Sequence, residues 1–272
     1  MVEIELTAEE LTSEDNTAHV EMTNDEIWFL KSFIKKYHPK KIVEVGVSAG
    51  GNTVNLLNWK DKDAQLFSVD IAKQWYVDTT KLSGFMAEEL KIKDNWKMYR
   101  GYDYIDVYEE IGNDIDFIII DTVHAMPGEF LTFLIALPQL KDGCVVILHD
   151  IHLNIMNMKR NQFENYKMSS YCTGMLHGGV SSNEKWTLKA RYVPNISAFV
   201  VDESTRENIK DIFHILCMTW FNFPFNPNWS QFSINEDKYF KYIKKHYTKD
   251  CYKLFKNCFE LQYKYFEYLN EE

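Results

Sequence analysis

The sequence has few cysteines, a deficit of basic residues and no long apolar run. Its five cysteines form no CxxC pair and their number is odd, so we expect no disulfide framework and a reducing environment. The 30 Lys and Arg residues are outnumbered by 40 Asp and Glu residues, which argues against a protein that binds nucleic-acid phosphates. No apolar run approaches the roughly 20 residues that span a bilayer. The acidic N-terminus does not resemble a signal peptide, so we expect a cytoplasmic protein with no nucleic-acid or membrane partner.

The sequence alternates between short apolar runs, typical of buried strands, and stretches in which apolar residues recur at helical spacing. Hydrophobic residues make up 46% of the chain, enough for one large domain. Short apolar runs alternate with stretches of helical spacing, which predicts an α/β fold with a doubly wound, mostly parallel sheet covered by helices on both faces. The expected strands are 40–46, 64–70, 95–101, 115–121, 144–150 and 196–202. The expected helices are 23–38, 52–58, 78–92, 104–111, 127–140, 205–220 and one or more from 235 onwards.

The alternation divides the chain into three parts. Residues 1–22 are a polar lead-in, and residues 23–204 contain the alternating strands and helices. Within that domain, the polar segment 151–195 interrupts the pattern, so we expect an irregular or helical cap over the substrate. Residues 205–272 are rich in aromatic side chains at helical spacing, which predicts a helical extension packed on the same domain.

A glycine-containing turn follows the first expected strand. Ligands bind to parallel sheets of this kind beyond the carboxyl ends of the strands, so residues at strand ends are the candidates for a site. Position 48 is serine, where the dinucleotide fingerprint GxGxxG would need glycine. The pattern Glu44-x-Gly46-x-Ser48-x-Gly50-Gly51 instead places a carboxylate before the turn, which suits an ammonium or a ribose hydroxyl. The alternative is a tight turn that Glu44 merely caps.

Asp70 ends the second expected strand, about twenty residues after these glycines. This is the position from which sheets of this architecture hold ribose hydroxyls. The alternative is that Asp70 caps the following helix.

These residues resemble the class I S-adenosylmethionine-dependent methyltransferases. VEVGVSAGG is similar to the first motif of that family, the VD that ends the second strand to its ribose motif, and RGYD (100–103) to its adenine-side loop. DTVH (121–124) and LPQLKDGCVVILHD (137–150) are similar to small-molecule O-methyltransferases of the catechol and macrolide-sugar type.

The resemblance implies a seven-stranded Rossmann-like sheet and S-adenosylmethionine as cofactor. The residues it assigns to the cofactor are Glu44, Gly46, Ser48, Gly50, Gly51, Asp70, Ile71, Gly101, Asp103 and Asp121. Glu44 and Asp70 would hold the ribose end, the glycines would contact the amino-acid portion, and Asp103 would lie near the adenine.

The same resemblance implies a metal site and a base. Asp121 and Asp150 would be ligands of Mg²⁺ or Mn²⁺, with His149 as a third. His124, three residues after Asp121, would take the proton from the acceptor hydroxyl. Alternatively there is no metal, and His124 or His149 is the catalytic base, assisted by Asp121.

We therefore expect an O-methyltransferase that acts on a hydroxyl of a small molecule, with a sugar or sugar-linked group as the acceptor implied by the resemblance, and possible assembly as a homodimer. Two other classes stay open at this point. One is a nicotinamide-dependent oxidoreductase, against which Ser48 argues. The other is a non-catalytic binding protein on a methyltransferase-like fold, against which the polar residues at every strand end argue.

Overall fold

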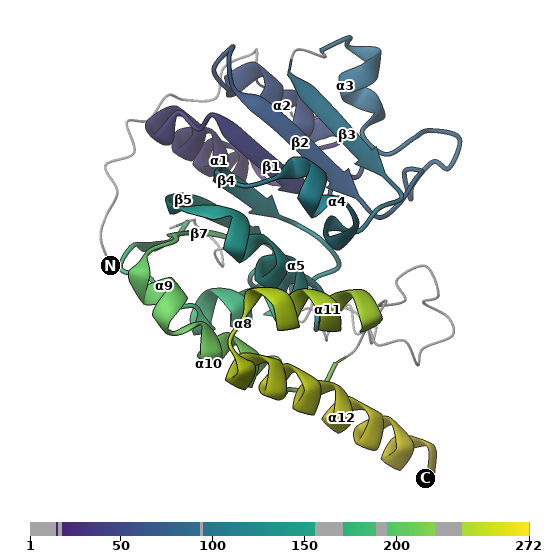
Figure 1. Cartoon of the computed structure of the whole chain (residues 1–272). Coiled ribbons are helices and arrows are strands. Elements are labelled where there is room, and N and C mark those ends of the chain that lie inside the picture. Colours follow the sequence, from purple (N-terminus) through teal and green to yellow (C-terminus); the bar gives the residue numbers. More distant parts are fainter. Residues whose placement is uncertain are drawn as a thin grey trace.

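A single seven-stranded sheet organises the chain (Figure 1). The computed structural model describes residues 15, 18–92, 95–155, 171–188, 195–220 and 236–271. The strand order is β3-β2-β1-β4-β5-β7-β6, which confirms the expected doubly wound Rossmann-like sheet. The strands are β1 (Lys41–Val45), β2 (Gln65–Asp70), β3 (Trp96–Arg100), β4 (Ile115–Ile120), β5 (Leu140–His149), β6 (Lys185–Thr187) and β7 (Ile196–Val200).

The first five strands run parallel to one another; β7 runs antiparallel to β5, and β6 runs antiparallel to β7 at the edge of the sheet. In the centre, Val43 of β1 pairs with Phe67 of β2 on one side and with Ile118 of β4 on the other. The chain order reverses between β1 and β4, because β2 and β3 lie to one side and β4 and β5 to the other. This reversal opens a crevice at the carboxyl ends of the central strands, where sheets of this kind bind ligands.

Helices cover both faces of the sheet, so the central strands are apolar throughout. One face packs against α1, α2 and α3, and the other against α4, α5, α8, α10, α11 and α12. The helices are α1 (Asn24–Tyr37), α2 (Gly51–Trp59), α3 (Phe85–Glu89), α4 (Tyr104–Ile111), α5 (Gly128–Ala136), α8 (Cys172–Gly179), α9 (Glu203–Glu207), α10 (Ile209–Ile215), α11 (Glu236–His246) and α12 (Lys249–Glu271). A 3₁₀ turn, η1 (Leu137–Gln139), follows α5.

The capping box expected at the start of α1 is present. The Thr23 hydroxyl accepts from the Glu26 amide, and the Glu26 carboxylate accepts from the Thr23 amide at 2.6 Å. None of the described helices is both long and apolar enough to cross a lipid bilayer.

Several elements differ from the expected ranges. The helix expected over 78–92 is reduced to α3, because the preceding loop is fastened elsewhere: the Ser83 amide donates to Lys73 and the Gly84 amide to Ser48. The helix expected over 205–220 is divided into α9 and α10 at Asn208. Part of the expected cap is regular, because it contributes α8 and the edge strand β6. The rest of that cap (156–170 and 189–194) and the expected turn 221–230 lie outside the described residues.

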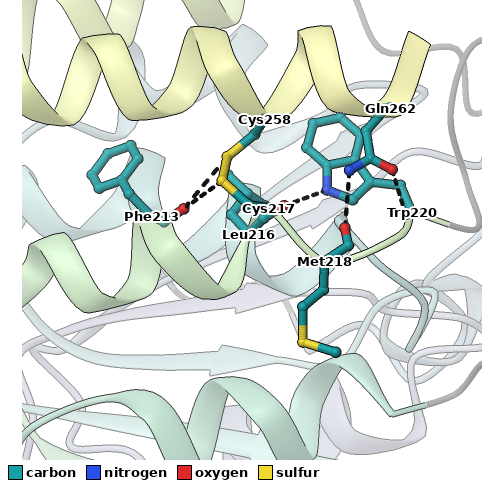
Figure 2. Close-up of a disulfide and its surroundings, with 7 residues drawn as sticks. All are labelled: Phe213, Leu216, Cys217, Met218, Trp220, Cys258 and Gln262. Carbon is teal, nitrogen blue, oxygen red and sulfur yellow. Dashed lines mark hydrogen bonds between the residues drawn. A yellow bond between two sulfur atoms is a disulfide. The ribbon is translucent and has the colours of Figure 1, made fainter. Parts of the chain in front are cut away.

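A disulfide joins Cys258 of α12 to Cys217, which lies two residues after the end of α10 (Figure 2). The expectation of no disulfide was therefore wrong for this pair, which tertiary folding brings together across 41 residues of sequence. Cys144, Cys172 and Cys251 are free and buried. Beside the disulfide, the Gln262 side chain accepts from the Trp220 amide and donates to the Met218 carbonyl, so α12 is also held by hydrogen bonds.

Candidate active site

A cavity of about 720 Å³ lies at the carboxyl ends of the parallel strands. Its walls come from the residues that follow β1, β2, β3 and β4. His19 and Glu21, before α1, and Tyr239 of α11 complete them. The lining residues from the strand ends are Val45, Gly46, Val47, Ser48, Asp70, Ile71, Gly101, Tyr102, Asp103, Tyr104, Asp121, Thr122, Val123 and His124. The volume is ample for a nucleotide-sized ligand.

The turn after β1 (residues 46–51, the glycine turn) requires glycine at position 46. This residue has φ +91°, and a Cβ there would lie 1.7 Å from the Asp121 carbonyl oxygen. The turn therefore packs directly against the end of β4. Ser48 also has positive φ, at 54°, and lines the cavity with its neighbours.

Asp70 holds this turn in place. Its Oδ2 accepts from the amides of Val47 and Ser48, at 3.0 and 2.9 Å, and from the Ser83 hydroxyl at 2.8 Å. Its Oδ1 accepts from the amide of Ala72. The carboxylate therefore fixes the shape of the cavity wall while also lining the cavity itself.

Asp103 lines the cavity from the N-cap of α4. Its Oδ1 accepts from the Tyr104 amide, and its Oδ2 accepts from the Tyr239 hydroxyl at 2.5 Å. Burial raises the pKa of the Asp103 carboxyl, although these hydrogen bonds oppose the shift. Tyr239 belongs to α11, so the C-terminal extension forms part of the cavity wall.

An acidic cluster follows β4 and β5. Asp121, His124 and Asp150 each offer a ligand atom, and the three atoms lie within 4.8 Å of one another. His124 Nε2 is 3.1 Å from Asp150 Oδ2 and 3.7 Å from Asp121 Oδ1. Two carboxylates and an imidazole form a donor set that fits a divalent cation.

Residues 43–151 match the family model described as a methyltransferase domain, and this segment contains every strand end that forms the cavity. The chain therefore contains a methyltransferase domain by similarity to this model. A comparison with curated protein sequences found no match.

Solved structures share the fold of this chain at low sequence identity. A Klebsiella pneumoniae protein assigned as an O-methyltransferase is 15% identical, with a TM-score of 0.52 over 69% of this chain and 84% of its own. The Bacillus cereus O-methyltransferase in complex with S-adenosylhomocysteine (SAH) is 16% identical, with a TM-score of 0.50 over 72% of this chain and 87% of its own. A SAH-bound methyltransferase from Podospora anserina is 10% identical, with a TM-score of 0.50 over 67% and 80%.

Glu44 lies beneath the cavity and not in its wall. The side chain is 2% exposed, and its Oε2 accepts from the hydroxyls of Thr53 and Ser68 at 2.8 and 2.6 Å. Burial raises the pKa of Glu44 to about 7. Gly50 and Gly51 are likewise outside the cavity lining, because each lies against backbone: Gly50 against Gly84, and Gly51 against the N-terminal segment.

His149 is also directed away from the cavity. It is 2% exposed, its Nδ1 is 3.3 Å from Asp121 Oδ1, and its Nε2 is 3.7 Å from Glu26 Oε1. Burial disfavours the imidazolium, but the carboxylates of Asp121 and Asp150 raise the pKa of His149 well above its usual value. The reciprocal attraction holds the pKa of Asp121 below its usual range despite its burial. His149 therefore connects the acidic cluster to the start of α1.

Three residues near the site had no signal in the sequence. Tyr239 is 136 positions from Asp103, and Glu21 lies in the polar lead-in, where no site residue was expected. Glu129 is fully buried behind His124, where its Oε1 accepts from the His124 amide at 2.6 Å and from the Thr122 hydroxyl at 2.8 Å. A glutamate in the first turn of a helix ordinarily interacts with the helix N-terminus, so its spacing gave no warning of this contact.

Proposed function

We propose that this methyltransferase transfers the methyl group of S-adenosylmethionine to a hydroxyl of a small molecule. The observation that carries the proposal is the continuity of the cavity, which extends from the glycine turn past Asp70 to Asp103 and also reaches Asp121 and His124. The wall that contains Asp70 and Asp103 can hold a nucleoside. The wall that contains Asp121 and His124 has the charged groups that O-methylation requires.

The adenosine part of the cofactor fits the end of the cavity near Asp103. Ile71, Tyr102, Tyr104 and Leu131 supply apolar surface there, which suits a flat aromatic base. Asp70 precedes this surface at the end of β2, where its carboxylate can accept from a ribose hydroxyl in addition to the loop amides it already holds.

Asp121, His124 and Asp150 would hold a divalent cation, Mg²⁺ or Mn²⁺. A cation held by these residues would lower the pKa of an acceptor hydroxyl and so help it to lose its proton. The imidazole in the donor set favours Mn²⁺ over Mg²⁺. Asn195 donates to Asp150 Oδ1 at 2.5 Å and thereby orients that carboxylate, as outer partners of ligands commonly do.

His124 Nε2 cannot be a cation ligand and a proton acceptor at the same time, because both roles use the same lone pair. In a protein that binds no cation, His124 would be the base that removes the hydroxyl proton. Glu129 supports either role, since its Oε1 lies 3.6 Å from His124 Nδ1 and accepts from the His124 amide.

The acceptor class is a small-molecule hydroxyl, and sugars are the first group to test. A polyhydroxylated acceptor is compatible with the polar lining supplied by Thr122, His124 and Thr132. An activity screen for SAH release, with sugars among the acceptors, tests this assignment.

The cofactor proposal is tested by calorimetric titration with S-adenosylmethionine and SAH. We expect micromolar binding by the parent and an approximately tenfold loss in Ile71→Ala, because this substitution removes apolar surface from the adenine end. The matched control is Leu90→Ala, which changes an exposed residue outside the cavity and should bind as the parent does. No binding of either ligand by the parent would sink the proposal.

The cation proposal is tested by titrating Mn²⁺ into the parent and into Asp150→Ala. We expect the variant to lose at least about a hundredfold in affinity, as it lacks one of three ligands. Asp142→Ala is the control, because that carboxylate is exposed and pairs with Arg206. If the parent binds no Mn²⁺, His124 is left as the base, and methyl transfer should then be insensitive to chelators.

A further inference from the structure

We propose that Glu21 binds the α-ammonium group of the cofactor, and that residues 18–22 form a strap that completes the amino-acid end of the cavity. This inference rests on the proposed cofactor and names a binding residue outside the strand ends that were expected to provide the site. Glu21 and His19 both line the cavity, although they precede α1 and belong to no strand.

The strap is seated on the glycine turn by the absence of a side chain at Gly51. A Cβ at Gly51 would lie 2.5 Å from the His19 carbonyl oxygen and 2.8 Å from that of Ala18. The His19 ring packs at 5.1 Å from the Trp75 ring and at 6.2 Å from the Phe85 ring. The strap therefore contacts both the start of α2 and the loop after β2.

Upstream, Asp15 anchors the same end of the chain. Its carboxylate accepts from Lys31 of α1 at 3.0 Å and from the Trp59 indole of α2 at 2.7 Å, and both partners in the ion pair are nearly buried. A buried pair of this kind holds the chain in one place more firmly than an exposed pair would. The strap is thus fixed at a defined position over the turn.

The Glu21 carboxylate bridges the glycine turn and the loop after β2, both of which line the cavity. Its Oε1 accepts from the Ser48 hydroxyl at 2.7 Å and from the Tyr76 hydroxyl at 3.0 Å. Both donors are neutral, and among the described residues no ion pair involves Glu21. The remaining oxygen lone pairs are therefore suited to a cationic group of a ligand.

The neighbouring polar atoms indicate which cation this is. Asn52 Oδ1 and Trp75 Nε1 have no hydrogen-bond partner, and both side chains line the cavity. An amino acid carries an ammonium and a carboxylate on one carbon, so it needs acceptors and donors side by side. Glu21 and Asn52 supply acceptors and Trp75 supplies a donor, whereas the lining after β2 and β3 offers the apolar surface suited to adenine.

The test compares two ligands that differ in the amino-acid portion. SAH contains it, and 5′-methylthioadenosine retains the adenine, ribose and sulfur without it. In Glu21→Gln we expect SAH affinity to fall about tenfold or more, because a charge-assisted hydrogen bond is lost, while the affinity for 5′-methylthioadenosine stays unchanged. Glu89→Gln alters an exposed glutamate outside the cavity and should change neither affinity.

The outcomes separate this inference from the proposed function. Equal SAH binding by the parent and Glu21→Gln would overturn the role of Glu21 while leaving the cofactor in place. An equal loss for both ligands would also overturn it, by assigning Glu21 to the shape of the whole cavity. A loss for S-adenosylmethionine but not for SAH would show that Glu21 faces the sulfonium. Failure of the parent to bind SAH would instead refute the cofactor proposal.

Discussion

The glycine turn and the acidic cluster both place carboxylates at strand ends, but they satisfy them differently. Asp70 receives three backbone amides and a serine hydroxyl, and Glu44 receives two hydroxyls. In the acidic cluster, Asp121 and Asp150 instead face the imidazoles of His124 and His149. A carboxylate surrounded by protein donors stabilises the fold of a loop, whereas carboxylates gathered around imidazoles form a set that a cation can occupy.

The largest loss of stability is expected where the glycine turn touches Asp121 of the acidic cluster. Gly46→Ala should lower the free energy of unfolding by more than about 4 kcal/mol, because the new Cβ would overlap the Asp121 carbonyl and force β1 and β4 apart. Chemical denaturation measures the loss. Gly143→Ala is the control: it also has positive φ, at 86°, but open space around it, so it should cost only about 1–2 kcal/mol. Equal losses in the two variants would show that the close approach at Gly46 is unimportant.

An intermediate effect is expected from the buried carboxyl of the glycine turn. The pKa of Glu44 is raised from 4.5 to about 7, so folding favours its protonated form. Its contribution to stability is fully present below pH 4.5 and is lost as the pH rises through 7, a change of up to about 3 kcal/mol. Glu44→Gln should therefore weaken the decline in stability between pH 5 and pH 8.

Denaturation across this pH range, in the parent, Glu44→Gln and Glu89→Gln, measures the difference. Glu89 is exposed, so its substitution should leave the pH dependence as it is in the parent. If Glu44→Gln declined as steeply as the parent, the buried carboxyl would not be the group that titrates.

The smallest effect is expected at the junction with the C-terminal helices. Tyr239→Phe removes the hydroxyl that donates to Asp103, which should cost about 1–2 kcal/mol in the free energy of unfolding and lower SAH affinity a few-fold, because the cavity wall loosens. Tyr265→Phe on the exposed side of α12 should change neither quantity. Loss of SAH affinity in both variants would indicate a general effect of the extension and not a contact at Asp103.

The sequence predicted most of the central elements because their signals are local. The apolar run of β4, the capping box of α1 and the eight residues of α4 can each be recognised from a few neighbouring side chains. Residues 71–84 differ from these elements, because hydrogen bonds join their backbone to the glycine turn. The intrinsic helical preference of that segment is overridden by contacts with distant residues, such as the hydrogen bond from the Gly84 amide to Ser48.

The structure brings most of the candidate site residues to one cavity, but Glu44 and His149 do not face it. Gly46, Ser48, Asp70, Ile71, Gly101, Asp103, Asp121 and His124 all line the cavity. Glu44 and His149 lie at strand ends as expected, but both are 2% exposed and point into the interior. Successive side chains of a strand point to opposite faces, and the residues just beyond it depend on how the turn packs, so spacing alone could not settle their direction.

The sequence by itself determined the parallel sheet, its two apolar faces and the edge at which polar residues gather. Periodicity and strand-end position are properties of short segments, and they survive without knowledge of the rest of the chain. Tertiary structure alone decided that Gly51 makes room for the strap, that Glu21 reaches the cavity, and that Tyr239 of α11 contacts Asp103. Each of these contacts joins residues far apart in sequence, and their encounter depends on the packing of whole helices around the sheet.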